Sequence, residues 1–308
     1  MQRYIIVRLL QGLLTIFLVS LGTFGLMHLA PGDPITLLVG ETQAGTEQVE
    51  RIKKQWGLDR PLHEQYLRWL SNMTRGDFGQ SVVRTGMPVR SMVGEAAAVT
   101  VKLNVWVFLL SIAIAVPAGI AAAVRRYSVL DYVTMVATTL GVALPNFWVG
   151  LMFIIIFALV LGWLPPFGLQ DWKGYVLPVS VLTLGQTALL ARMMRGSTME
   201  AMGEDFARTA RAKGLREPAV ILRHVVRNAL LPVVTVIGYR LAFLLSGTII
   251  VETVFALPGL GQLFIESVNR VDYQVVQVIV LLLSTLVILG NLLTDLVYGY
   301  IDPRIRFG

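Results

Sequence analysis

The chain has 308 residues, of which 55% are hydrophobic and only 15% are charged. The apolar residues come in runs of about 20, the length that a helix needs to cross a bilayer core, and this excludes an ordinary soluble domain. The sequence has no cysteine, which excludes disulfides and thiol chemistry, and its formal net charge is +7.

Six apolar segments predict an all-α integral membrane protein with six transmembrane helices. We expect the spans at 9–30, 99–124, 132–161, 176–194, 232–255 and 275–300. Arg3 and Arg8 precede the first segment, as in a signal peptide, but the segment is long and has no small-residue cleavage site, so we expect an uncleaved span. The chain then divides into the first span (1–30), a polar insert (31–98) and a five-helix transmembrane core (99–308) with a charged loop (197–232).

The basic residues are unevenly distributed between the two sides of the membrane. If the N-terminus is cytoplasmic, the cytoplasmic segments hold fourteen Arg and Lys residues, whereas the two short outer loops hold only Lys173 and Arg270. This asymmetry predicts that both termini are cytoplasmic and that the insert is extracytoplasmic, since long inserts are translocated largely regardless of charge. Topology therefore explains the basic excess, and we expect no nucleic-acid partner. Within the insert we expect short helices at 47–56 and 62–73.

The charged loop is too polar to lie in lipid, and its pattern predicts local structure. Ser197 and Glu200 have the spacing of a capping box, which predicts a helix start. Asp205 is placed to cap a short helix, and Gly214 is placed to end that helix in a left-handed turn.

A second helix is predicted from Glu217, because Pro218 in a first turn loses no hydrogen bond. One face of this helix is apolar and the opposite face is basic. The apolar residues are Ile221, Leu222, Val225, Val226 and Ala229, and the basic residues are Arg216, Arg223 and Arg227. Charge alone favours a loop that only sets topology. Two amphipathic helices joined at a glycine also have the form of a docking platform for a soluble partner.

The loop resembles one known family. EDFARTARAKGL, followed by RHVVRNALLPVVTV, is similar to the coupling loop of permease subunits of ATP-binding-cassette (ABC) importers. The narrower resemblance is to the peptide/nickel branch, which includes dipeptide, oligopeptide and glutathione permeases. The general family pattern begins Glu-Ala-Ala, three residues, Gly. Here only Ala210 and Gly214 fit this pattern, and the Leu231-Pro232 pair comes later after the glycine than in the general pattern. Both departures are habitual in the peptide branch.

Other segments resemble the same branch, so the resemblance covers nearly the whole chain. They are LAPGDP after the first span, GLDRPLHEQYLRWL in the insert, VETVFALPGLGQLFIESV after the fifth span and NLLTDLVYGYIDPRIRF at the end. The PGLG turn at 258–261 is expected to open a short helix on the outer side.

The resemblance implies a permease subunit in the bacterial cytoplasmic (inner) membrane, in contact with lipid. A sister permease would complete a heterodimer, two ABC ATPase subunits would grip the cytosolic loops, and an extracytoplasmic substrate-binding protein would deliver substrate. The insert would either dock that protein or brace the bundle. Coupling to the ATPases through the 204–232 loop would involve Glu204, Asp205, Phe206, Arg208, Thr209, Ala210, Arg211, Lys213 and Gly214.

The sequence contains no phosphate-binding G-x-x-x-x-G-K-[ST] loop, so ATP and Mg would be bound by the partner ATPases and this chain would be non-catalytic, without a cofactor of its own. His28, His63 and His224 belong to three separate segments, so no metal site is predicted.

Polar residues within spans are the candidates for lining the substrate path, because lipid makes them costly. Arg240 lies about 12 Å into its span at about 1.5 Å per residue. It would either attract a substrate carboxylate or pair with an acid on the partner subunit. Gln186 and Asn146 are the other candidates, whereas Glu252 and Asp295 lie near span ends and are expected to be structural.

Two other classes of membrane protein fit the sequence less well. An ion-coupled secondary transporter would need inverted repeats or charged clusters at the midplane, and an intramembrane enzyme would need convergent acid–base or metal residues; the sequence shows neither. Peptides are the first choice of substrate. Glutathione and nickel or other metal chelates are the alternatives, since LGWLPPFGLQDWKGYVLP resembles glutathione- and nickel-type members.

Overall fold

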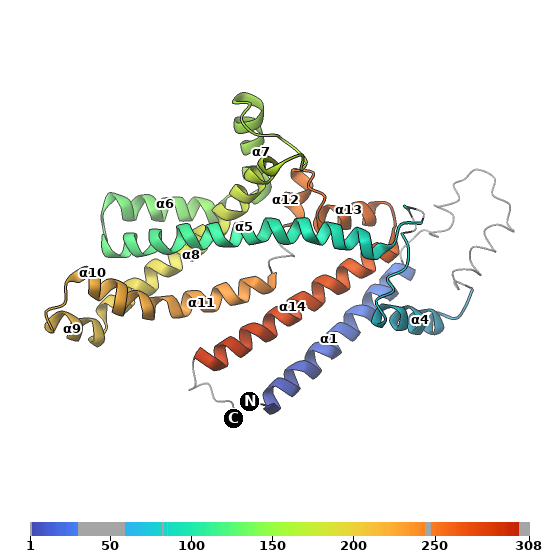
Figure 1. The fold of residues 1–308 in the computed structure, drawn as a ribbon, viewed down its shortest axis with the longest axis horizontal. Helices are drawn as coiled ribbons and strands as arrows, with labels where there is room; N and C mark the ends of the chain where they lie inside the picture. The colour runs from blue at the N-terminus through green and yellow to red at the C-terminus, as the bar shows by residue number, and fades with distance from the viewer. Residues whose placement is uncertain (1, 30–58, 82, 85, 244–247, 302–308) are drawn as a thin grey trace. The chain divides into compact units, whose positions relative to one another are not determined.

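The described part of the chain in the computed structural model is helical (Figure 1). Backbone is described for residues 2–29, 59–81, 83–84, 86–243 and 248–301, and side chains for 6–25, 59–81, 83–84, 86–237 and 248–292. Within these ranges the strand-like pairing is limited to one antiparallel bridge between Gln80 and Pro88. The chain forms two compact units, Met1–Val99 with Gly259–Ile288 and Thr100–Pro258 with Leu289–Gly308.

The first unit contains α1 (Gln2–Leu29), α4 (Leu62–Thr74), the first part of α5 (Val89–Val124), α13 (Leu260–Asn269) and the first part of α14 (Tyr273–Ile301). α1 and α14 approach closely at Gly12, where an added Cβ would lie 2.8 Å from Cγ2 of Ile288. Buried apolar side chains of α5, α13 and α14 form a core: Val89, Met92, Val93, Ala96, Leu260, Leu263, Val275, Val278 and Ile279.

α4 confirms the helix predicted at 62–73 and packs on α1. The hydroxyl groups of Ser20 and Tyr66 are 2.8 Å apart, and the rings of Phe24 and Tyr66 meet edge to face with centroids 5.3 Å apart. Aromatic burial together with one hydrogen bond therefore ties the insert to the first span. The helix predicted at 47–56 lies outside the described residues.

α5 begins at Val89, ten residues before the expected start of the second span at 99. Arg90, Ser91 and Glu95 interrupt the apolar run there, which is why hydropathy missed this part of the helix. The buried side chains on the other face of these turns pack against α13 and α14, so the segment is an amphipathic extension of the span. The helix therefore starts ten residues before the predicted membrane span, which lies within it.

The second unit holds the rest of α5 and α14, α6 (Val129–Ala143), α7 (Asn146–Phe153), α8 (Val176–Gly203), α9 (Asp205–Ala212), α10 (Glu217–Ala219), α11 (Val226–Phe243) and α12 (Ile249–Val254). It also has π-helical turns η1 (Ile154–Val160) and η3 (Val220–Val225) and a 3₁₀ turn η2 (Trp172–Tyr175). α5 and α6 pack closely on α8. A Cβ on Gly119 would lie 2.7 Å from the Ala191 carbonyl oxygen, and one on Gly141 would lie 2.8 Å from Cβ of Ala188.

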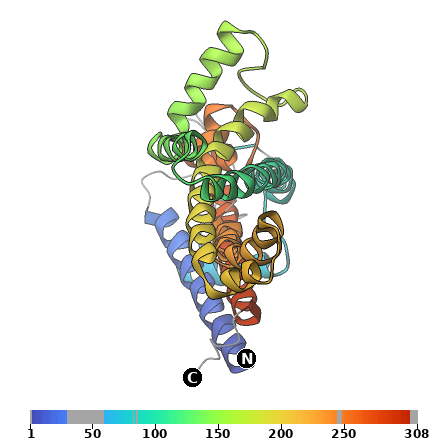
Figure 2. The same ribbon diagram turned by 90° about the vertical axis from the view of Figure 1, so that its left-hand side faces the viewer.

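The third predicted span, 132–161, is broken rather than straight. α6 and the α7–η1 segment are bent by 104° at Leu144 and Pro145 (Figure 2). Leu144 is extended, with φ −82° and ψ 128°, because proline disfavours the helical conformation of the residue before it. Five helices among the described residues are long and apolar enough to cross a membrane, or six if this bent pair is one span. The second count agrees with the expected six.

The fifth predicted span, 232–255, does not coincide with one helix. Helical structure runs without interruption from Glu217 to Phe243, with Pro232 inside α11, and the apolar candidate span is Glu217–Ile237. A proline within a membrane helix is tolerated where other groups satisfy the freed carbonyl, so Pro232 did not mark a helix start. The residues after 248 form the separate helix α12.

Candidate functional site

The candidate site is the loop that joins α8 to α11, at one end of α8 (Figure 1). α8 has 28 residues. At 1.5 Å per residue this is about 42 Å, longer than a bilayer core of about 30 Å. The capping box predicted at Ser197 and Glu200 was wrong, because both residues lie inside α8, which ends at Gly203. Thr198 and Ala201 are buried, so tertiary packing continues the helix past the local start signal.

α9 confirms the predicted short helix, with one correction at its start. Glu204 is the extended residue before the helix, and Asp205 is the first helical residue rather than the cap. The Asp205 carboxylate lies 3.4 Å from the Arg208 guanidinium and is almost fully exposed. A carboxylate in the first turn interacts favourably with the positive end of the helix dipole.

Gly214 ends α9 as predicted. Its φ is +79°, in the left-handed region that glycine adopts without a steric penalty. The N–H of Gly214 donates to the Arg211 carbonyl at 2.9 Å, and the N–H of Leu215 donates to the Ala210 carbonyl at 3.4 Å. These two bonds form a Schellman motif, which satisfies carbonyl groups at the helix end and reverses the chain toward α10.

α9 has a buried face and an exposed face. Ala207 and Ala210 are 0% and 4% exposed. They pack in a core formed with residues of α5, α8, η3 and α11: Ala115, Leu190, Ala191, Met194, Ala201, Val220, Val225, Ala229 and Val233. The other predicted coupling residues Phe206, Arg208, Thr209 and Lys213 are exposed. The loop is therefore a folded extension of the spans that presents one side of α9 to solvent.

Arg211 links the three parts of this loop. Its guanidinium donates to the Glu217 carboxylate at 2.8 and 3.1 Å and to the Met202 carbonyl at 3.3 Å. The hydrogen bond to Glu217 raises the pKa of Arg211 above its usual value, so the group stays charged. The end of α8, the end of α9 and the start of α10 are thus held together by one side chain.

The second helix begins at Glu217 with Pro218 in its first turn, as predicted. Arg216, Arg223 and Arg227 are exposed, which confirms the basic face. The apolar face was wrong at Leu222, which is 67% exposed. The π-helical turn η3 (Val220–Val225) has more residues than an α-helical turn and so changes which side chains face inward.

Two of the three substrate-path candidates lie close together. Asn146 is the first residue of α7, and its Oδ1 is 3.3 Å from the position that a Cβ on Gly185 would take. Gln186 is the next residue of α8 and is partly exposed. Arg240 lies in α11, and its side chain is outside the described residues. In the described part of the chain, no three His, Asp or Glu residues are grouped to hold a metal ion.

Sequence reasoning missed an ion pair between α6 and α8. The Arg195 guanidinium donates twice to the Asp131 carboxylate, at 2.6 and 2.8 Å, and the Tyr127 N–H donates to the same carboxylate at 3.0 Å. The side chains are 21% and 4% exposed for Arg195 and Asp131. Ser128 caps α6 by accepting from the Asp131 N–H, and this was a local signal for the helix start that carries Asp131. Nothing in the local sequence indicated that Arg195 is the partner of Asp131.

A second polar contact supports the structural interpretation of Glu252. This residue of α12 is fully buried, and its carboxylate accepts from the hydroxyl groups of Thr100 at 2.8 Å and Thr248 at 2.9 Å. The contact joins α12 to the beginning of the α5 segment in this unit.

The fold is that of a multi-span membrane protein with a folded, charged loop between two of its candidate spans. Residues 115–307 match the family described as the binding-protein-dependent transport system inner membrane component, and residues 1–103 match the N-terminal region of membrane components of such systems. The chain therefore belongs to this family and is a permease subunit of the peptide/glutathione type of ABC importer.

Two curated relatives match along their whole length. The chain is 40% identical over 307 residues to the glutathione transport system permease protein GsiC of Escherichia coli (strain K12), with 100% of both chains covered. It is 37% identical over 317 residues to the oligopeptide transport system permease protein AppB of Bacillus subtilis (strain 168), again with 100% of both covered.

One solved structure has a similar fold. It is described as the crystal structure of an amino acid ABC transporter with histidines, and it matches with a TM-score of 0.51 and 16% identity over 70% of this chain and 95% of that chain. The likeness concerns the fold alone.

Proposed function

We propose that this chain forms half of the translocation pathway of an importer for short peptides, the tripeptide glutathione included. The support is the full-length similarity to one permease named for glutathione and another named for oligopeptides. A sister permease would form the other half, and an extracytoplasmic binding protein would deliver the substrate. Asn146, Gln186 and Arg240 are the residues proposed to line the path.

Coupling to ATP is proposed to run through α9. Two partner ATPase subunits would bind ATP and Mg and would contact the exposed face that includes Phe206 and Arg208. Because Ala207 and Ala210 are buried in a core with α8 and α11, a displacement of α9 would move the ends of both helices with it. ATP binding would thereby stabilise one orientation of the pathway relative to the other, without chemistry on the substrate.

The proposed topology has both termini in the cytoplasm and the insert outside. The distribution of Arg and Lys among the short loops supports it, provided that the bent α6–α7 pair counts as one span. The loop 197–232 is then cytoplasmic, where the ATPases are. With only five spans the termini would lie on opposite sides.

Uptake of a labelled dipeptide tests the proposed substrate class. Cells lacking this gene, with the rest of the transport system intact, are compared with cells in which the gene is restored. We expect uptake to be lost and then recovered, and excess glutathione to compete while a nickel chelate does not. Unchanged uptake of both the dipeptide and glutathione in the deletion strain would overturn the peptide assignment and leave the family assignment intact.

A further inference from the structure

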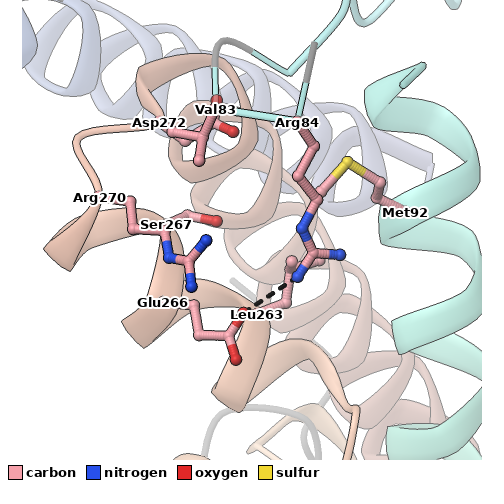
Figure 3. A pocket seen from close by; sticks show the side chains of 8 residues that line it. All are labelled: Val83, Arg84, Met92, Leu263, Glu266, Ser267, Arg270 and Asp272. Atoms are coloured by element: carbon pink, nitrogen blue, oxygen red, sulfur yellow. Dashed lines mark hydrogen bonds and ion pairs between the residues drawn. The ribbon is translucent and has the colours of Figure 1, made fainter. Parts of the chain in front are cut away.

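Charged side chains gather at two places that the proposed transport mechanism does not use. The first is a small cleft beside α13, shown in Figure 3. Two arginines and two acids line this cleft, so its charges are balanced, and it has room for only about one water molecule. The second place is the corner between α5 and α6 in the second unit, where the charges at the surface are not balanced.

The corner between α5 and α6 carries net positive charge at its surface. Arg125 and Arg126 follow the last residue of α5, and both are exposed. In the described part of the chain, neither forms an ion pair with an acid. Asp131, the nearest acid along the chain, is already engaged by the Arg195 guanidinium at 2.6 and 2.8 Å. These two opposite charges cancel, so the positive charge of the two exposed arginines is left over.

Tyr127 fixes the geometry of this corner. Its φ is +63°, a left-handed conformation that is uncommon for a bulky residue. Its N–H donates to the Asp131 carboxylate at 3.0 Å, and Asp131 is in turn held by Arg195 of α8. The Tyr127 ring is 67% exposed, and the Arg126 guanidinium lies over it, 4.5 Å from the ring centroid. The largely buried ion pair therefore positions a backbone that presents a tyrosine and a stacked arginine outward.

The exposed face of α6 next to this corner is apolar. Val129, Val133 and Val136 are 79%, 61% and 58% exposed. A large exposed apolar face on a membrane protein marks a surface that lipid or another protein covers. Tyr127 and Tyr132 lie at the end of this face, and tyrosine is enriched where membrane helices reach the level of the lipid headgroups. The corner thus has the composition of the boundary between hydrocarbon and headgroups.

Distances along α8 separate this corner from the proposed contact with the ATPase. From Arg195, which binds Asp131 at the corner, α8 continues to Gly203, about 12 Å further at about 1.5 Å per residue. Each headgroup layer of a bilayer is only about 5–8 Å thick. Because the apolar face of α6 ends at the corner, the corner lies in this layer and α9 lies beyond it. The exposed arginines of the corner are therefore at the level of lipid phosphates rather than of the ATPase.

We propose that Arg125, Arg126 and Tyr127 form a binding site for the phosphate of an anionic phospholipid of the cytoplasmic leaflet. One face of the Arg126 guanidinium stacks on the Tyr127 ring, which leaves the N–H groups at its edge to bind phosphate oxygens in pairs. Arg125 adds a second cation, and the cytoplasmic leaflet carries the complementary negative charge. The proposal rests on the proposed function only for the leaflet, which follows from the proposed topology.

The test measures lipid binding to the complete transporter in detergent by native mass spectrometry. Dioctanoyl phosphatidylglycerol is titrated into the wild type, Arg126→Gln and Tyr127→Gly. Dioctanoyl phosphatidylcholine is titrated separately, and inorganic phosphate is added as a competitor, so that an anionic lipid is distinguished from a zwitterionic lipid and from free phosphate. The matched control is Arg216→Gln, which removes the same charge from an exposed arginine between α9 and α10, beyond the headgroup layer.

We expect Arg126→Gln to lower the affinity for the first phosphatidylglycerol about fivefold, the contribution of one basic residue near an anionic surface. Tyr127→Gly relieves the backbone strain, because glycine adopts positive φ freely, but it removes the ring that supports Arg126. It should therefore weaken binding in a folded protein. Arg216→Gln should bind the lipid as the wild type does, and inorganic phosphate should not displace it.

Unchanged affinity in Arg126→Gln or Tyr127→Gly would overturn the proposal. So would an equal loss in Arg216→Gln, equal binding of phosphatidylcholine by the wild type, or displacement of the lipid by inorganic phosphate. These measurements do not involve the transported substrate, so their failure would leave the proposed function to be decided by the uptake experiment.

Discussion

Substitution of Gly214 tests whether the shape of the α9–α10 turn is needed for coupling. Gly214 has φ +79°, and no atom lies within 4 Å of the position that a Cβ would take. The cost of adding a side chain is therefore conformational rather than a collision. For alanine the left-handed conformation costs about 1–2 kcal/mol. Asparagine tolerates this conformation better, and a β-branched valine tolerates it worse.

A cost of about 1–2 kcal/mol lowers the population of the native turn about 5- to 30-fold relative to alternatives, since 1.36 kcal/mol is a factor of ten. We expect coupled activity to fall in the order Gly, Asn, Ala, Val at position 214, with Gly214→Val abolishing uptake while membrane insertion is retained. The assay is ATPase stimulation by substrate-loaded binding protein, with retention of the ATPase subunits on purification as a second readout.

The matched control is Gly196→Ala within α8. Gly196 also has no atom within 4 Å of an added Cβ, but it is helical, so alanine should be neutral or slightly stabilising. Full coupling in Gly214→Val, at normal expression, would show that coupling does not need the left-handed turn. Equal losses in Gly214→Ala and Gly196→Ala would show the same, because the loss would then not depend on the left-handed conformation.

Substitutions at three contacts test the packing and ion pairs inside the second unit. Gly119→Leu should overfill the α5–α8 contact at a cost of about 1–3 kcal/mol or more and lower the melting temperature in detergent; an unchanged melting temperature would show that α8 can move away. Arg211→Gln should loosen the link to Glu217 and reduce coupled ATPase activity, while Arg211→Lys retains part of it; full activity in Arg211→Gln would exclude a linking role. Asp131→Asn and Arg195→Gln should each lower the melting temperature and be strongly non-additive together, whereas additive effects would mean that the pair contributes no interaction of its own.

The features of the 197–232 loop that the sequence predicted correctly are ones that depend only on residues within one helical turn. The left-handed end at Gly214 and the start at Glu217 with Pro218 follow from backbone sterics alone, and both were confirmed. Ser197 carried an equally local start signal, but the packing of Thr198 and Ala201 continued α8 through it. A local helix-start signal therefore fails where burying side chains of a continued helix stabilises the fold more than a helix cap would.

Contacts between distant residues could not be predicted from the pattern. Asp131 and Arg195 are 64 residues apart, and neither differs in its local sequence from an ordinary interfacial charge. The buried side of α9 was also undetermined, because Ala210 and Phe206 are both apolar residues in a short charged helix. The structure buries Ala210 within its own subunit, so Ala210→Glu would disturb folding of the loop as well as docking.

Phe206 lies on the exposed face of α9 that is proposed to contact the ATPase, so a cysteine at this position reports on that contact. The chain has no cysteine, so Phe206→Cys and Phe167→Cys provide single reactive sites on the predicted cytoplasmic and outer sides. In membranes containing the complete transporter, a thiol-to-amine crosslinker is applied to each variant. We expect Phe206→Cys to crosslink to an ATPase subunit and to be shielded from an impermeant thiol reagent added outside, whereas Phe167→Cys should show the reverse. Failure of Phe206→Cys to crosslink in an active transporter, or its labelling from outside, would show that α9 does not contact the ATPase on the cytoplasmic side.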